Sequence, residues 1–173
     1  MLIIFTGNGK GKTTAAIGQA LRTIGDGKRV LMVQFIKGPW KSGEDTSQEK
    51  LWPEFRIVKK GIGFVGIGND QIPFEDHVKA AHDAMDYALR MITQEKPDMI
   101  ILDEVINALD LKLIEKGDVN YFLEYAHPRV ENIIFTGRNC PEWLIETADL
   151  VTEMREIKHP FNQGLKGARG LEY

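Results

Sequence analysis

The fold is decided by the stretch from Leu2 to Thr14, which reads LIIFTGNGKGKTT. The apolar run Leu2–Thr6 predicts a buried strand, and a helical period begins at Lys12. A glycine-rich loop between a strand and a helix turns its backbone N–H groups and the helix N-terminus toward one anion. Lys12 adds a point charge, and the Thr13 hydroxyl can ligate a magnesium ion. The stretch therefore predicts a triphosphate-binding loop with Lys12 and Thr13 as catalytic candidates. The candidate nucleotide-binding residues of the loop are Gly7, Asn8, Gly9, Lys10, Gly11, Lys12, Thr13 and Thr14.

The loop departs at one position from the strict phosphate-loop pattern, which has a glycine where this chain has Thr6. Gly7 and Gly9 compensate, because glycine allows the tight or left-handed turns that bring the backbone close to a phosphate. Two interpretations of Lys10 stay open. Its side chain either reaches a terminal phosphate or faces water.

Short runs rich in Ile, Val and Leu recur along the chain and predict strands buried on both faces, as in a parallel sheet. They lie at Leu2–Thr6, Val30–Phe35, Phe55–Val58, Met99–Leu102, Asn132–Thr136 and Leu150–Met154. Helices are predicted at Lys12–Ile24, Phe74–Thr93, Thr46–Leu51, Asp118–Ala126 and Pro141–Ala148. The longest has Phe74, Val78, Ala81, Met85, Leu89 and Ile92 on one stripe. This alternation implies an α/β fold with helices on both faces of the sheet. We expect a single three-layer P-loop NTPase-like domain over residues 1–173, with a mostly parallel sheet of about six strands.

A second buried strand runs into Asp103 and Glu104. In nucleotide sites, an acid in this position holds the metal that bridges the phosphates. The sequence therefore predicts a metal site made of Thr13, Asp103 and Glu104, with Mg2+ as the expected ion and Mn2+ as the alternative. A further strand leads to Arg138, which either contacts phosphate or is a surface arginine.

Composition excludes several classes of protein. The chain carries 22 Lys and Arg against 25 Asp and Glu, so its formal net charge of -3 gives no global attraction to nucleic acid or to an anionic membrane. Cys140 is the only cysteine, which excludes an internal disulfide and indicates a reducing compartment. The start lacks a signal peptide, and no apolar run approaches the roughly 20 residues that span a bilayer. We therefore expect a cytoplasmic protein without nucleic-acid or membrane partners.

These residues predict a nucleotide triphosphate and a metal ion, but not a reaction. Hydrolysis, phosphoryl transfer and attack at the sugar all remain open. No serine, histidine and acid combine into a defensible catalytic set. A small-molecule kinase and a nucleotide-switched regulatory ATPase are the competing interpretations.

Taken together, the motifs resemble the ATP:corrinoid adenosyltransferases of the cobalamin pathway, in the bacterial class built on a phosphate loop. The matching blocks run in family order over nearly the whole chain: Thr6–Ala16, Val33–Gly38, Gly61–Phe64, Leu102–Glu104, Thr136–Arg138, Val151–Arg155 and Lys158–His159. The blocks Gln34–Gly38 and Thr152–His159 are not shared with nucleotidases at large, which makes the resemblance specific.

The resemblance implies that the cobalt of cob(I)alamin, or of a related corrinoid, attacks the 5′ carbon of ATP, expels triphosphate and forms adenosylcobalamin. Reduced cobalt is itself a strong nucleophile, so the protein need not supply a general base or a covalent residue. Lys12, Thr13, the metal and the backbone amides of Gly9 to Thr13 are expected to stabilise the leaving triphosphate. The resemblance also suggests an electron-donating flavoprotein reductase and a homodimer.

The chain departs from the family in the loop after Phe64. Family members commonly carry a tryptophan two residues further on, where this chain has Gly66. Phe64 is retained and is the candidate for the corrinoid face, with plain core packing as the alternative. Many members also have a segment before the first strand that helps to cover the corrinoid. This sequence begins at that strand, so we expect the cover either to come from elsewhere or to be missing.

Overall fold

The structure is a computed structural model that describes residues 1–66, 70–164, 168 and 170–171. In this part of the chain, six strands form one sheet with the order β3-β2-β4-β5-β1-β6. Every neighbouring pair is parallel, so the sheet is entirely rather than mostly parallel. The strands are β1 (Leu2–Thr6), β2 (Val30–Gln34), β3 (Phe55–Lys59), β4 (Met99–Asp103), β5 (Asn132–Thr136) and β6 (Leu150–Glu153).

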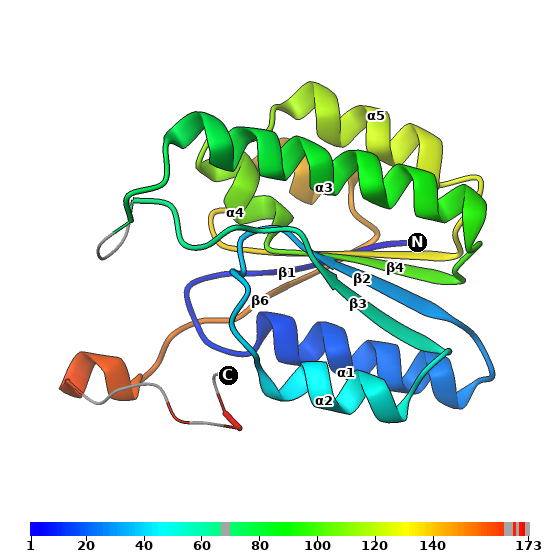
Figure 1. Cartoon of the computed structure of the whole chain (residues 1–173), viewed down its shortest axis with the longest axis horizontal. Coiled ribbons are helices and arrows are strands. Elements are labelled where there is room, and N and C mark those ends of the chain that lie inside the picture. The colour runs from blue at the N-terminus through cyan, green and yellow to red at the C-terminus, as the bar shows by residue number, and fades with distance from the viewer. Residues whose placement is uncertain (67–69, 165–167, 169, 172–173) are drawn as a thin grey trace.

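Helices cover both faces of the sheet, which confirms the predicted three layers. In Figure 1, α3, α4 and α5 lie on one face and α1 and α2 on the other. The helices are α1 (Lys12–Gly25), α2 (Gly43–Lys50), α3 (Phe74–Gln94), α4 (Val105–Asp110), α5 (Lys116–Ala126) and α6 (Glu142–Thr147), followed by a 3-10 turn, η1 (Pro160–Gln163).

Alternating side chains of the sheet build two separate cores. Along β1, Leu2 and Ile4 pack with α3, α4 and α5, whereas Ile3 and Phe5 pack with α1. Both sets are almost fully buried, because successive side chains of a strand point to opposite faces and both faces are covered. This double burial is why the strands read as continuous apolar runs.

One prediction about burial is wrong, and a second holds for most of its residues. β6 is largely exposed, with Leu150 43% accessible, because β6 is an edge strand that pairs only with β1 within the described residues. Most of the predicted stripe on α3 is buried or packs against the core, including Ala81, Met85 and Ile92. Phe74 is the exception at 49% exposed, and the buried face also includes His77, Ala84 and Ala88. Small residues lie on that face because α3 packs closely on the sheet and on α5.

The carboxyl ends of the strands bring the chemically active residues together, as expected for an open parallel sheet. The register pairs Gln34 of β2 with Asp103 of β4. Leu102 of β4 pairs with Phe135 of β5. Asp103 is the residue after Leu102, and Thr136 is the residue after Phe135. One row across the sheet therefore holds Gln34, Asp103 and Thr136, and β1 leads into the phosphate loop at the same edge.

Among the helices of the described residues, none combines the length and the apolar character needed to cross a membrane.

Candidate active site

The phosphate loop is wrapped around the side chain of its own lysine. The Lys12 Nζ donates hydrogen bonds to the carbonyl oxygens of Gly7 and Gly9, at 2.8 and 2.9 Å. Burial lowers the pKa of Lys12, and the nearby Arg138 charge lowers it further. The end of β6 braces the loop, since the Gly9 N–H donates to the Met154 carbonyl at 2.6 Å. A Cβ on Gly7 would come within 2.6 Å of the same carbonyl oxygen, which explains the need for glycine there.

The carboxylate of Asp103 is fully buried and accepts three hydrogen bonds from side chains. Thr13 and Thr136 donate to its Oδ1 at 2.8 and 2.7 Å, and the Gln34 amide donates to its Oδ2 at 3.1 Å. Donors from α1, β5 and β2 therefore meet at one acid of β4. The network fixes the hydroxyl of Thr13 at the start of α1, beside the phosphate loop.

Glu104 has a left-handed backbone, with φ 62° and ψ 18°, which is uncommon for a residue with a side chain. The Thr136 hydroxyl accepts a hydrogen bond from the Glu104 N–H at 2.8 Å and so supports this conformation. The Glu104 Oε2 is buried and makes no hydrogen bond. Burial and the adjacent Asp103 charge raise the pKa of Glu104 to about 7. Such an oxygen is suited to a cation.

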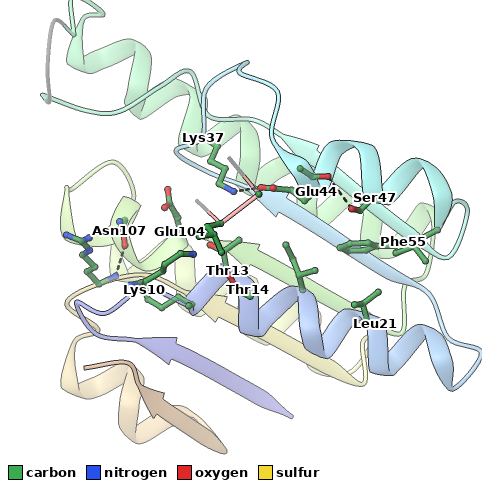
Figure 2. A pocket seen from close by; sticks show the side chains of 18 of the residues that line it. Lys10, Thr13, Thr14, Leu21, Lys37, Glu44, Ser47, Phe55, Glu104 and Asn107 are labelled. Carbon is green, nitrogen blue, oxygen red and sulfur yellow. Dashed lines mark hydrogen bonds and ion pairs between the residues drawn. The ribbon is translucent and has the colours of Figure 1, made fainter. Parts of the chain in front are cut away.

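A cavity of about 650 Å³ joins most of the predicted site residues. Those that line it are Lys10, Gly11, Lys12, Thr13, Thr14, Phe64, Glu104 and Arg138. Asn8 is exposed and does not line the cavity. Gly7 and Gly9 do not line it either, but their carbonyl oxygens accept hydrogen bonds from Lys12. Figure 2 shows a polar end beside Lys10 and Asn107 and an apolar end beside Leu21 and Phe55.

Two features of the cavity were missed from the sequence. Lys37 forms an ion pair with Glu44 across from the phosphate loop (Figure 2). Burial opposes the charge on Lys37, but Asp103 and Glu44 outweigh it and raise the pKa of the lysine. Asn107 accepts a hydrogen bond from the Arg138 N–H at 2.6 Å. Spacing along the sequence does not identify either residue as part of the cavity, although Lys37 lies within the Gln34–Gly38 block.

Comparison with known proteins gives a consistent result. Residues 1–173 match the family model described as ATP:corrinoid adenosyltransferase BtuR/CobO/CobP. A corrinoid adenosyltransferase of Escherichia coli strain K12 is 38% identical over all of this chain and 85% of its own length. One from a Sinorhizobium species is 39% identical over all of this chain and 80% of its own length.

Among solved structures, the flagellar accessory protein FlaH of Methanocaldococcus jannaschii superposes with a TM-score of 0.56. The alignment covers 88% of this chain and 69% of FlaH, at 11% sequence identity. This likeness concerns the fold alone.

The first prediction concerns the Thr136 hydroxyl. Thr136→Val keeps the shape of the side chain but removes one of the two hydrogen bonds to Asp103 Oδ1 and leaves the Glu104 N–H without a partner. Each loss costs about 1–3 kcal/mol, so we expect the free energy of unfolding to fall by about 2 kcal/mol or more. The matched control Thr136→Ser keeps the hydroxyl and should lose only about 1 kcal/mol for its missing methyl group. Urea unfolding measures both variants, and a loss in Thr136→Val no larger than in Thr136→Ser would contradict the network.

The second prediction concerns Glu104 in metal-free protein. Its folded pKa of about 7 lies above its usual value of 4.5, so the protonated acid stabilises the fold below that usual value. This stability is lost as the pH rises through about 7. Relative to the unsubstituted chain, Glu104→Gln should gain at least about 1 kcal/mol of unfolding free energy between pH 5 and pH 8.5. Urea unfolding at both pH values with a chelator present measures the gain, and a difference independent of pH would refute the assignment.

Proposed function

Because the chain belongs to the ATP:corrinoid adenosyltransferase family, we propose that it holds ATP on Gly7–Thr14 while a reduced corrinoid attacks the 5′ carbon. The enzyme transfers the adenosyl group of ATP to the cobalt of a corrinoid and releases triphosphate. The observation that carries the assignment of residues is the convergence of Lys12, Thr13 and Glu104 on one cavity. The relatives favour this reaction over a kinase or a regulatory ATPase.

The phosphate loop supports the departure of triphosphate. Negative charge accumulates on the leaving group as the bond to the 5′ carbon breaks, so contacts to the phosphates strengthen in the transition state. The Lys12 ammonium would exchange its bonds to the Gly7 and Gly9 carbonyls for bonds to phosphate oxygens. The N–H groups from Lys10 to Thr13, at the start of α1, add the partial positive charge of a helix N-terminus. The Gly9 N–H, which was expected to join them, donates instead to the Met154 carbonyl.

No side chain needs to act as a nucleophile, since reduced cobalt brings its own electron pair. The one cysteine is also unsuited to that role. Burial raises the pKa of the Cys140 thiol to about 11, which keeps it protonated at neutral pH. The chain's part in the reaction is to orient ATP and to neutralise the triphosphate.

The residues around Glu104 fit Mg2+. Within the described residues, no three His, Cys, Asp or Glu side chains gather into a metal cluster. The ion would therefore rely on few protein oxygens and on the phosphates, as magnesium in nucleotide sites does. We assign direct contact to the free Oε2 of Glu104 and to the Thr13 hydroxyl. Asp103 would orient that hydroxyl, because both of its oxygens already accept hydrogen bonds. When bound, the ion would neutralise phosphate charge, and Mn2+ is the alternative with similar ligand preferences.

The other cavity residues divide between the two substrates. Arg138 has an exposed side chain at the cavity edge and is assigned to the phosphates, as is Lys10. Lys37 lines the same cavity and, like Lys12 and Arg138, is a cation near Glu104. Phe64, which is 53% exposed, is assigned to the corrinoid rather than to the core.

The setting of the enzyme is proposed from chemistry. Cob(I)alamin requires a low-potential electron source, for which a flavoprotein reductase is the proposed partner. A single cysteine suits the reducing cytoplasm. We also propose that residues 1–173 form one domain and that the active protein is a homodimer.

The third prediction tests the role of Lys12. Lys12→Ala removes the cation from the leaving triphosphate, so kcat should fall at least about 100-fold. Lys10→Ala is the comparison, and its exposed side chain should cost less than about fivefold. Triphosphate release from Mg-ATP and chemically reduced cobalamin, measured without oxygen, gives both rates. A loss below about tenfold for Lys12→Ala would overturn its assigned role.

A further inference from the structure

Two aromatic rings lie exposed beside the nucleotide cavity, on the loops that follow β2 and β3. Trp40 is 61% accessible and Phe64 is 53% accessible. Their ring centroids are 6.0 Å apart and their planes differ by 20°, so the rings are stacked. Large apolar side chains that remain exposed together on a folded surface indicate a binding site rather than a core.

Trp40 is held in place although its ring is exposed. The indole packs directly on Gly38, where an added Cβ would lie 2.5 Å from a ring carbon. It also touches Gly63, whose added Cβ would lie 3.5 Å from the ring. The Trp40 carbonyl accepts a hydrogen bond from Lys59 at 2.7 Å, and Lys59 is anchored by an ion pair with Asp45. These contacts hold the Trp40 ring in place, so the side chain has little conformational freedom left to lose on binding.

Phe64 belongs both to this aromatic pair and to the wall of the nucleotide cavity. It lines the cavity that contains the phosphate loop, and it also lines a second cavity of about 560 Å³. Trp40, Gly63 and Ile72 form part of the second cavity. Two other cavities within the described residues, one beside Met1 and one beside Trp143, share no lining residue with the nucleotide cavity. The second cavity thus adjoins the nucleotide cavity at Phe64, which lines both.

The chemistry of the second substrate fits this surface. A corrinoid is a flat macrocycle with a conjugated system, and flat conjugated ligands stack on aromatic rings. It must also reach the 5′ carbon of ATP. Gly66 has no side chain that could add a second ring on the loop of Phe64. The second ring beside Phe64 comes instead from Trp40, on the other loop.

We propose that Trp40 is a corrinoid-binding residue, whose indole stacks beside Phe64 and receives one face of the macrocycle next to the nucleotide cavity. This inference rests on the proposed function and adds a specific residue to it. Trp40 would act on corrinoid affinity and leave ATP affinity unchanged, because it lines only the second cavity.

The fourth prediction tests Trp40 by substitution in the full chain. Trp40→Ala should raise the Kd for cobalamin about tenfold, as expected for loss of an aromatic stacking partner. Trp40→Phe keeps a ring and should change the Kd less than about threefold. Trp52→Ala is the matched control, because Trp52 is also 61% exposed but lines neither cavity. Equilibrium dialysis with cobalamin measures these values, and an unchanged Kd for Mg-ATP shows that each variant is folded.

A spectroscopic test reports on Trp40 directly. The chain has three tryptophans, so Trp52→Phe combined with Trp143→Phe leaves Trp40 as the sole tryptophan. Cobalamin absorbs light and should quench the fluorescence of Trp40 in a saturable way, with the Kd found by dialysis.

The outcomes separate the two claims. A Kd for cobalamin within twofold of the unsubstituted value in Trp40→Ala overturns the inference while the proposed function stands. If that Kd is unchanged and Trp40→Ala also alters how the elution volume of the protein depends on its concentration, the aromatic pair is an interface between copies of the chain. That outcome also overturns the inference. Failure of the unsubstituted protein to bind cobalamin or to form adenosylcobalamin would overturn the proposed function, and the inference with it.

Discussion

The buried carboxylate of Asp103 accepts hydrogen bonds from Thr13, Thr136 and Gln34, and so ties the phosphate loop to three strands of the sheet. A buried charge is tolerated only when its oxygens are satisfied, so these donors have little freedom to move away. The sheet register places Gln34, Asp103 and Thr136 in one row, and the row in turn sets the hydroxyl of Thr13 and the backbone of Glu104. The geometry of the whole site depends on this constraint.

Charged groups of both signs lie near that row, and some of them have no full partner of opposite charge. Glu104 keeps one oxygen unpaired and has a raised pKa, while Lys12 has a lowered one. Both shifts mark groups that would gain from a ligand of opposite charge, since burial has removed water without supplying a full partner. The proposed complex of ATP with Mg2+ would offer both, with the metal toward the acid and the phosphates toward the lysine. The charges of the site therefore support the proposal that ATP binds together with a metal ion.

Most of the fold could be predicted because the strands are buried on both faces and appear as apolar runs between helical periods. The exposed edge strand β6 was misjudged, since an apolar run does not reveal which strand ends the sheet. α4 was missed because it is short and starts from a left-handed residue, Glu104. In the site, the phosphate loop and the acids follow from motifs. The contacts of Thr136 with Asp103 and of Trp40 with Phe64 join segments that are distant in the sequence, and spacing along the chain does not encode them.

The most direct test of the account is to incubate the purified protein with Mg-ATP and chemically reduced cobalamin without oxygen, and to follow the corrinoid spectrum and the phosphate products together. The account predicts one triphosphate released for each adenosylcobalamin formed, because a single bond at the 5′ carbon is broken. Unchanged corrinoid with ADP as the product would contradict the account. The phosphate loop would then bind ATP for phosphoryl transfer or hydrolysis instead.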